Sequence, residues 1–371
     1  MQSFIYFCTK QIYFLMKLLS SQNYTIELGS ILDSSFQDLL NNHYSGAKKI
    51  IIVDENTHDN CLEFLLTSFD TLKEAEVMLL PAGEENKVME VCFQVWEALT
   101  EYQIGRNDLI INLGGGVVTD MGGFIASLFK RGVDFIHIPT SLVGMVDASI
   151  GGKNGVDLGS YKNQLGVFSH PKFIFIDPLF LATLPAEEWM NGYAEMLKHT
   201  LISDRNKYNN LKHISSGLDL KNLELIADSV HIKFDIVEAD PLEIGLRKIL
   251  NFGHTIGHAI EGFFLEIEAI SHGHAVALGM IAESYIAMQQ GKLSKEDYFD
   301  IELTLLEKFS VPKLEDNYFQ EIAELTRNDK KNRDSKILCS LVTEIGTCEF
   351  NCEVTLEEII ESLKYLSRFH K

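Results

Sequence analysis

The sequence has few features of a membrane, extracellular or nucleic-acid-binding protein. No stretch reaches the ~20 apolar residues that cross a bilayer, and the apolar start MQSFIYFCTKQIYFLMKLL is interrupted by Lys10 and Gln11. The six cysteines form no CxxC pair, which favours a reduced, cytoplasmic compartment without a disulfide framework. Positive charge is also scarce. The formal net charge of −21 argues against nucleic acid or a membrane surface as a partner, but not against an anionic substrate.

The remaining composition is ordinary for a globular enzyme, with 46% hydrophobic and 23% charged residues. A chain of 371 residues is expected to form two domains, each with its own core. We expect residues 1–24 to be an N-terminal extension, with Met16 as a possible biological start. Residues 25–184 then form the first domain and residues 185–371 the second.

The first domain alternates short apolar runs with amphipathic segments, a pattern that predicts a parallel sheet covered on both faces by helices. The apolar runs lie at 48–57, 76–87, 108–116, 133–141 and 172–180. Ligands of such sheets bind at the carboxyl ends of the strands. The polar sequences DENT, PAGEENK, GGGVVTD and PTSL all follow a predicted strand, and we expect the ligand site there.

In the second domain the strand pattern fades and long amphipathic segments predict helices. These segments are residues 185–204, 227–240, 246–264 and 272–290. Near the end of the chain, residues 336–350 predict a hairpin of two short strands, and residues 354–369 predict a closing helix. The second domain is therefore expected to be mainly helical.

A strand followed by glycines and a helix, DLIINLGGGVVTDMGGF, predicts a phosphate-binding turn in the first domain. Glycines allow close approach of a pyrophosphate, and the helix N-terminus offers free N–H groups. The motif is not GxGxxG, and close packing at Gly122 and Gly123 would also explain it. Asp54 could accept a hydrogen bond from a ribose hydroxyl or cap a helix, while Glu84 and Lys87 follow a third strand.

Four residues of the second domain predict a divalent metal site with an open position. Glu195 lies in GYAEMLKH, His254 and His258 in LNFGHTIGHAIE, and His272 in SHGHAVALGM. His254 and His258 are spaced i,i+4 and share one helix face. Only one of this pair needs to be a ligand, and the other could transfer protons or contact an anion.

Two further segments carry charged residues among glycines or apolar residues. DASIGGKNG places Asp147 and Lys153 around a glycine pair, which is either a glycine-rich turn or a substrate loop crossing between the domains. In RKILNFGHT, Arg247 and Asn251 lie one helical turn apart, just ahead of His254. Arg247 is suited to bidentate contact with a carboxylate or phosphate.

These motifs closely resemble those of the 3-dehydroquinate synthase family. The resemblance covers roughly residues 25–365. The segments that carry it are PAGEENK, GGGVVTDMGGF, FKRGVDFIHIPTSL, MVDASIGGKNGVDLGSYKNQLG, GYAEMLKH, GLRKILNFGHTIGHAIE, HGHAVALGM and DKKN, in that order. The resemblance implies an N-terminal Rossmann-like α/β domain and a C-terminal helical domain, with the active site in the cleft between them.

The resemblance also implies roles for individual residues. Glu195, His254 and His272 would bind zinc, with cobalt as a possible substitute. The residues around NAD would be Asp54, Asn56, Glu84, Lys87, Gly115, Gly116, Asp120, Thr140, Ser141, Lys162 and Thr183. The residues that contact the substrate or act on it would be Arg131, Asp147, Lys153, Asn163, Lys198, Lys233, Arg247, Asn251, His258 and Lys330, with Lys331 as the alternative to Lys330.

The activity implied by the resemblance converts 3-deoxy-D-arabino-heptulosonate 7-phosphate to 3-dehydroquinate and phosphate. NAD would oxidise the substrate transiently and be regenerated in each turnover, zinc would polarise the reacting oxygen, and His258 would relay protons. The family resemblance also suggests a homodimer. Other sugar-phosphate cyclases, a metal-dependent polyol dehydrogenase and a non-catalytic paralogue are the alternatives.

The sequence departs from the family pattern at one position close to the predicted metal ligands. The family usually has HGEAVA where this chain has HGHAVA, so that His274 replaces the expected glutamate. The replacement puts any role of that glutamate in orienting a ligand in doubt. It also leaves open a competition between His274 and His272 for the metal.

Overall fold

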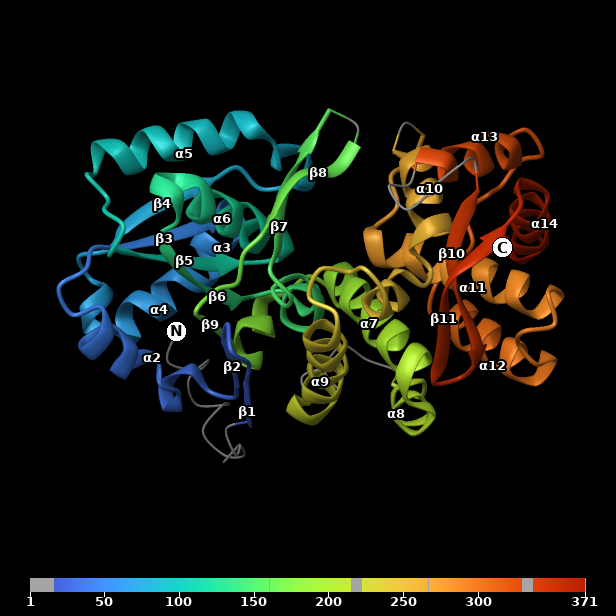
Figure 1. Cartoon of the computed structure of the whole chain (residues 1–371), viewed down its shortest axis with the longest axis horizontal. Helices are drawn as coiled ribbons and strands as arrows, with labels where there is room; N and C mark the ends of the chain where they lie inside the picture. The colour runs from blue at the N-terminus through green and yellow to red at the C-terminus, as the bar shows by residue number, and fades with distance from the viewer. Residues whose placement is uncertain (1–16, 160, 215–221, 266, 329–335, 371) are drawn as a thin grey trace. The chain divides into compact units, whose positions relative to one another are not determined.

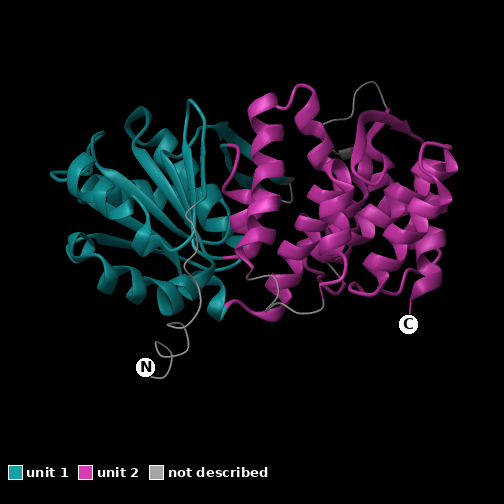
Figure 2. Ribbon diagram, turned by 90° about the horizontal axis from the view of Figure 1, so that it is seen from below, with its two compact units in different colours: residues 1–140, 152–183 teal, residues 141–151, 184–371 magenta. Residues whose placement is uncertain are grey.

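The computed structural model describes residues 17–159, 161–214, 222–265, 267–328 and 336–370, which form two compact units (Figure 2). Unit 1 contains residues up to 140 together with residues 152–183, and unit 2 contains residues 141–151 and 184–371. A single boundary after residue 184 was expected. The structure differs in one segment, because residues 141–151 group with the second unit. Among the described residues, no helix is long and apolar enough to span a membrane.

Unit 1 is built on a seven-stranded sheet in the order β1-β2-β9-β6-β5-β3-β4 (Figure 1). All neighbouring strands are parallel except β1 and β2. The strands are β1 (Lys17–Ser20), β2 (Thr25–Leu28), β3 (Lys49–Asp54), β4 (Glu76–Leu80), β5 (Leu109–Gly114), β6 (Asp134–Pro139) and β9 (Phe173–Ile176). The five predicted strands are present. Two were missed, and β1 lies inside the segment predicted to be an N-terminal extension.

The helices of unit 1 bury the apolar faces of the central strands, and this explains the apolar runs of the sequence. They are α2 (Phe36–Asp38), α3 (Glu55–Thr57), α4 (Glu63–Ser68), α5 (Met89–Glu101) and α6 (Gly116–Leu128). Leu99 of α5 and Val118 and Phe124 of α6 share one core cluster with Ile52 and Ile110 of the sheet. The predicted α/β class with a parallel sheet is confirmed.

The segment after residue 152 forms a hairpin, where the sequence predicted a glycine-rich turn or loop. Strands β7 (Lys153–Leu158) and β8 (Tyr161–Phe168) pair antiparallel. The side chain of Asn154 lies where a side-chain carbon on Gly123 of α6 would collide with it. The close packing considered for Gly122 and Gly123 is therefore real, since Gly122 stands equally close to Asn112.

Unit 2 is mainly helical, as predicted, with one hairpin (Figure 1). Its helices are α7 (Ala186–Ser203), α8 (Arg205–Leu211), α9 (Leu223–Ala239), α10 (His254–Phe264), α11 (His272–Gln289), α12 (Lys295–Leu306), α13 (Tyr318–Leu325) and α14 (Leu356–Leu366), together with the short turns η7 (Gly144–Ala148) and η10 (Leu246–Asn251). The predicted late hairpin is β10 (Ile337–Glu344) with β11 (Thr347–Val354). The closing helix α14 begins at a capping box of Thr355 and Glu358.

The predicted helix over residues 246–264 is broken in two. The turn η10 ends at Asn251, and Gly253 adopts the left-handed conformation with φ of 79° before α10 begins at His254. A residue with a side chain is strained at this φ, which is why glycine stands there. Arg247 and Asn251 therefore do not share a helix with the histidines, contrary to the sequence prediction.

Candidate functional site

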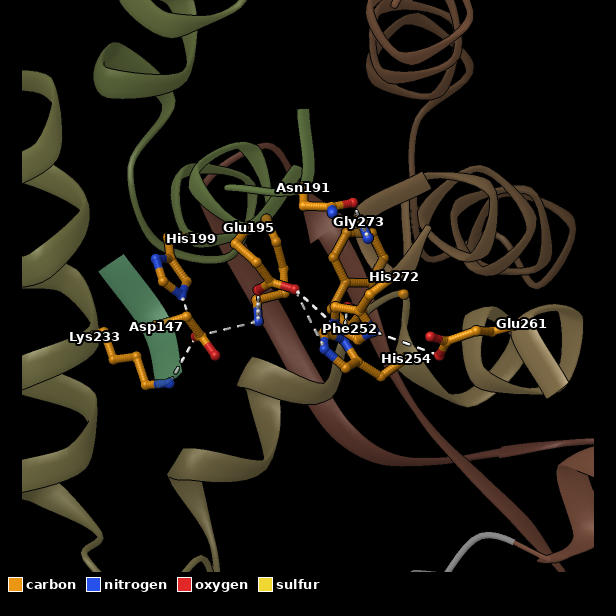
Figure 3. A network of polar contacts seen from close by, with 12 residues as sticks. Asp147, Asn191, Glu195, His199, Lys233, Phe252, His254, Glu261, His272 and Gly273 are labelled. Atoms are coloured by element: carbon orange, nitrogen blue, oxygen red, sulfur yellow. Dashed lines mark hydrogen bonds and ion pairs between the residues drawn. The ribbon is translucent and has the colours of Figure 1, made fainter. Parts of the chain in front are cut away.

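The four predicted metal-site residues come together inside unit 2. Glu195 lies in the middle of α7, and His254 and His272 are the first residues of α10 and α11. The Glu195 Oε1 atom is 3.5 Å from Nε2 of His254 and 3.6 Å from Nε2 of His272 (Figure 3). The nitrogens of His254, His258 and His272 lie within 4.8 Å of one another, so the structure brings His258 to the same place.

The donor atoms of this cluster fit a divalent cation. Glu195 is 1% exposed, and within the described residues its Oε1 atom accepts no hydrogen bond. A buried carboxylate oxygen without a donor is costly unless a cation meets it. Imidazole nitrogens and a carboxylate oxygen are the ligand set of zinc sites that keep an open position. The residues present therefore suit a metal such as zinc or cobalt.

The other ring nitrogens of two of these histidines face groups that can orient them. Nδ1 of His254 donates to the carbonyl oxygen of Phe252 at 3.1 Å, and Nδ1 of His272 lies 3.5 Å from Glu261 Oε2 (Figure 3). Such outer contacts fix the tautomer and direction of a metal-binding histidine. Glu261 thus provides a carboxylate next to His272, although the chain lacks the glutamate that the family pattern has at position 274.

His274 does not take part in the metal cluster. Its Nε2 atom contacts the carbonyl oxygen of Ser310, and its ring lies beside Phe309. Among the described residues, the histidines grouped for metal binding around Glu195 are His254, His258 and His272. The competition between His274 and His272 considered from the sequence is therefore not supported.

The protonation of the metal cluster is governed by burial and by the neighbouring charges. Burial and the nearby Lys198 ammonium hold the pKa of His254 well below its usual range. For His272, burial lowers the pKa, but Glu195 and Glu261 outweigh this effect and raise it to about 9. Because a metal-bound histidine is neutral at the ligating nitrogen, metal binding would release the proton of His272.

A cluster of buried charges lies beside Glu195 in the same unit. Lys198 forms an ion pair with Glu195 and lies 3.8 Å from Asp147 Oδ1. The same oxygen is 2.6 Å from Lys233 Nζ and 3.1 Å from His199 Nε2 (Figure 3). Asp147 belongs to η7, so these contacts with α7 and α9 explain why residues 141–151 group with unit 2.

The charges of this cluster shift one another's pKa values. For Asp147, burial opposes ionisation, but Lys233 and Lys198 hold the pKa well below its usual range. Burial lowers the pKa of Lys233 to about 8, against the opposing effect of Asp147. Burial also lowers the pKa of His199, so that its ring is neutral. Of these groups, Lys233 can exchange a proton close to neutral pH.

Arg247 and Asn251 are held by the loop that precedes them. Arg247 is 2% exposed, and its Nη1 donates to the carbonyl oxygen of Pro241 at 2.6 Å. The Asp240 carboxylate accepts from three backbone N–H groups of this loop, including that of Arg247 at 3.0 Å. Asn251 donates to Glu243 at 2.7 Å. The guanidinium is thus placed by main-chain contacts, with Gly151 packed against it.

In unit 1, the residues that follow the strands also gather around a lysine. Lys87 is 3% exposed, and its Nζ donates to Asp120 at 2.6 Å and to Asn163 at 2.8 Å, with Glu84 at 3.7 Å. Burial opposes the charge of Lys87, but Asp120 and Glu84 outweigh it and raise the pKa. Asn163, predicted to contact substrate, lies here with residues predicted to surround NAD.

The remaining strand-end residues of unit 1 lie at the carboxyl ends of β3, β5 and β6. Gly115 precedes α6 and offers no side-chain cap, which leaves the N–H groups of the first turn, from Gly116 on, for another acceptor. Asp54 caps α3, and its Oδ1 accepts from the Thr57 N–H at 2.7 Å. The helix-cap alternative for Asp54 is therefore realised. Thr140 is buried directly after β6, whose last residues pair with the end of β5.

Several other predicted residues lie elsewhere along the two units. Arg131 lies beyond the C-terminal end of α6, just before β6 begins, and so at the edge of the sheet opposite Gly115. Lys153 begins β7 and is exposed, Asn56 and Thr183 are exposed, and Ser141 accepts from the Gly144 N–H in unit 2. Lys162 belongs to β8. Lys330 and the alternative Lys331 lie outside the described residues.

Sequence reasoning missed three buried residues next to the site: His199, Glu261 and Glu283. His199 directly follows Lys198 and Glu261 ends GHAIE, so both were visible inside motifs used for the prediction. Nothing in their spacing distinguishes them from core residues. Their partners come from other helices, and this required the tertiary structure.

Comparisons with known proteins agree with this geometry. Residues 77–191 match the family profile described as 3-dehydroquinate synthase N-terminal, and residues 192–332 match 3-dehydroquinate synthase C-terminal. The 3-dehydroquinate synthase of Parabacteroides distasonis is 39% identical over 339 residues, which cover 90% of this chain and 95% of that protein. The chain belongs to the 3-dehydroquinate synthase family. The synthase of Thermoanaerobacter pseudethanolicus is 38% identical over 88% of this chain and 93% of its own length.

Solved structures show the same fold. 2-epi-5-epi-valiolone synthase from Streptomyces hygroscopicus, with NAD+ and Zn2+ bound, superimposes with a TM-score of 0.81 at 28% identity, covering 96% of this chain and 99% of that chain. A 2-deoxy-scyllo-inosose synthase complexed with carbaglucose-6-phosphate, NAD+ and Co2+ gives a TM-score of 0.80 at 23% identity, covering 96% of this chain and 100% of that one. The family resemblance inferred from the sequence is confirmed.

Proposed function

We propose that this chain is a 3-dehydroquinate synthase that converts 3-deoxy-D-arabino-heptulosonate 7-phosphate to 3-dehydroquinate and phosphate, with NAD+ and a divalent metal. One observation carries the proposal: the metal-type cluster of Glu195 and three histidines adjoins a buried cluster of cations in the same unit. A phosphorylated sugar acid needs both a Lewis acid for its hydroxyls and cations for its anionic groups.

The metal cluster suits zinc on the chemistry of its donors, with Glu195, His254 and His272 as the proposed ligands. Zinc supplies polarisation of a substrate hydroxyl when it is bound. His258 is exposed and lies next to these ligands, so its ring can be reached by the substrate. It would exchange a proton with the hydroxyl group that faces the metal.

The cofactor site proposed for NAD+ lies in unit 1. The uncapped N-terminus of α6, after Gly115, suits a pyrophosphate. Lys87, in the segment after β4, forms an ion pair with Asp120 of α6, the helix that follows β5. NAD+ supplies a hydride acceptor when it is bound. Asp54, Asn56 and Thr140 are proposed to contact it from the ends of β3 and β6, with Ser141, Lys162 and Thr183 nearby.

The cationic residues are proposed to hold the substrate. Lys198, Lys233 and Arg247 are almost completely buried, and these three cations meet two carboxylates, since Asp147 faces both lysines and Glu195 pairs with Lys198. With Glu195 bound to the metal, positive charge is left over for the anionic groups of the substrate. The proposal extends to Arg131, Lys153, Asn163, Asn251 and Lys330 as further substrate contacts, on the family resemblance alone.

Phosphate release from the heptulosonate phosphate, with NAD+ at catalytic concentration, tests the proposal most directly. We expect many phosphates released per NAD+ and no net accumulation of NADH. Failure to release phosphate with the metal-loaded protein would overturn it. A sugar phosphate without a carboxylate should react poorly, because Arg247 would then face no anion. Preferential turnover of that compound would instead indicate another sugar-phosphate cyclase.

A second test concerns Lys153, which the family pattern places on the substrate. The Lys153→Ala variant is expected to retain zinc and lose turnover. Normal turnover would show that Lys153 is a surface residue without a role in the reaction. The homodimer and the cytoplasmic location also stay predictions, and sedimentation of the purified chain tests the first.

A further inference from the structure

Glu283 is a fully buried carboxylate that contacts the start of another helix. It lies in α11 with 0% of its surface exposed. Its Oε2 accepts from the backbone N–H of Gly253 at 2.6 Å, and its Oε1 accepts from that of Ile256 at 3.1 Å. Both N–H groups belong to the first turn of α10 or to the residue that precedes it. Burying a carboxylate costs free energy of folding unless hydrogen bonds or a charge compensate for the lost water.

The position of this carboxylate is explained by the way α10 begins. The first N–H groups of a helix need acceptors, which the residue before the helix usually supplies from its side chain. That residue here is Gly253, which has no side chain and adopts a left-handed conformation. Glu283 supplies the acceptors from α11 instead, and its negative charge suits the positive end of the helix dipole.

The two helices are also packed too closely for any larger residue at the crossing. A side-chain carbon on Gly279 would collide with the carbonyl oxygen of Gly253 and lie 2.6 Å from the Gly257 nitrogen. A side-chain carbon on Gly257 would lie 2.8 Å from the Ala275 carbonyl oxygen. Glu283 therefore joins two backbones that are already in direct contact, and it fixes the start of α10 on α11.

Both helices carry proposed metal ligands on their first residues. His254 directly follows Gly253, and His272 begins the helix that bears Glu283. The start of α11 is in turn fixed to α7, the helix of Glu195, since the Gly273 N–H donates to Asn191 Oδ1 at 2.9 Å (Figure 3). The three proposed ligands are thus carried by helices that are joined to one another through buried polar contacts.

We propose that Glu283 is a positioning residue of the metal site, which holds His254 in register with His272 and Glu195 and so raises the affinity for the metal. The inference rests on the metal site of the proposed function. Groups that orient metal ligands typically change metal affinity by about 10–100-fold when they are removed. A carboxylate that served only the stability of the core would leave the affinity of the folded protein unchanged.

The chain offers a matched control in Glu302. This glutamate lies in α12 of the same unit, is 8% exposed, and accepts from the Tyr298 hydroxyl at 2.5 Å. It contacts none of the proposed ligands in the polar contacts of the described residues. Glu302→Gln therefore makes the same chemical change in a buried position without touching α10.

The experiment measures the Zn2+ affinity of the metal-stripped full-length protein by competition with a chelating dye. We expect Glu283→Gln to bind Zn2+ at least about tenfold more weakly than the wild type, and Glu302→Gln to bind within about twofold of it. Native circular dichroism of each variant shows that it is folded. Equal Zn2+ affinity of folded Glu283→Gln and wild type would overturn the inference, and so would equal weakening in the control.

Two additions keep the result interpretable. If Glu283→Gln does not fold, Glu283→Asp retains the charge but shortens its reach, and it should weaken Zn2+ binding and alter the visible absorption of the Co2+-loaded protein. A folded Glu283→Asp with the affinity and Co2+ spectrum of the wild type would also overturn the inference. If the wild type binds no Zn2+, the proposed function is wrong. If the wild type binds Zn2+ tightly and the Glu283 variants bind it equally well, only the inference about Glu283 is wrong.

Discussion

The two units assemble their polar groups in different ways. In unit 1, Lys87, Asp120 and the start of α6 meet because they follow parallel strands that end at one edge of a sheet. In unit 2, Asp147, Glu195 and the histidines come from η7, α7, α10 and α11 and are held by ion pairs in the interior. The first arrangement follows from backbone topology, whereas the second depends on individual side chains. Substitutions should therefore be tolerated differently in the two units.

The largest effect is expected at Glu195. Glu195→Gln removes a proposed ligand and takes from the buried Lys198 the nearer of its two carboxylates, so zinc and activity should both be lost. Breaking a buried ion pair also costs about 3 kcal/mol of unfolding free energy. Zinc content after dialysis, phosphate release and urea unfolding measure the three effects. Glu188→Gln on the exposed start of the same helix is the control. A Glu195→Gln variant with zinc and full activity would exclude Glu195 from the ligand set.

The corresponding change in unit 1 should separate the cofactor from the metal. Lys87→Met removes the donor to Asp120 and Asn163, and we expect NAD+ affinity to fall by about 10–100-fold, the range for hydrogen bonds to charged groups. Zinc content should not change. Isothermal titration calorimetry with NAD+ measures the effect. The control is the variant Lys73→Met, which makes the same change at an exposed lysine. Loss of zinc in the Lys87→Met protein would contradict the separation of the two sites.

The pH dependence of zinc binding should reveal the charges around His272. Its raised pKa of about 9 means that the ring is protonated at neutral pH and must lose that proton to bind zinc. Zinc affinity should therefore rise by about tenfold per pH unit between pH 7 and pH 8 and level off above pH 9. Dye competition at several pH values measures this slope.

The variant Glu261→Gln removes one of the two carboxylates that raise this pKa. The plateau of zinc affinity should then begin at lower pH than in the wild type. An affinity that does not change between pH 7 and pH 8 in the wild type would show that His272 gives up no proton on binding.

The smallest effect is expected at His199, whose neutral ring links Ser229 to Asp147. Its Nδ1 is 2.7 Å from the Ser229 hydroxyl and its Nε2 is 3.1 Å from Asp147. His199→Leu should lower kcat about tenfold, the value of one hydrogen bond to a charged group, with zinc content unchanged. His199→Gln can still donate toward Asp147 and should recover part of kcat. Equal kcat values for the Leu and Gln variants would show that the hydrogen bond is not what matters.

Much of the fold could be predicted because short sequence patterns, such as apolar segments and helix caps, indicate its strands and helices. The buried strands β3, β5 and β6 consist mostly of apolar residues, and α14 begins at a recognisable capping box. The break at Gly253 was missed because residues 246–264 keep an amphipathic pattern through the glycine. The hairpin from Lys153 was missed because its glycines resemble those of a turn, although they serve close contacts such as that of Gly155 with the Leu165 carbonyl.

The sequence alone determined the chemistry that is available: a glycine-rich turn at the head of a helix, a glutamate and histidines at recognisable spacing, and lysines and arginines in an acidic chain. Those features depend on residue types and on their spacing along the chain, and both can be recognised without the tertiary structure. Only the tertiary structure decided which groups meet. It placed η7 with unit 2, turned His274 toward Ser310, and set Glu261 and Glu283 behind the histidines. The physical reason is that buried charges are stable only beside partners, and here those partners lie on helices far apart in the sequence.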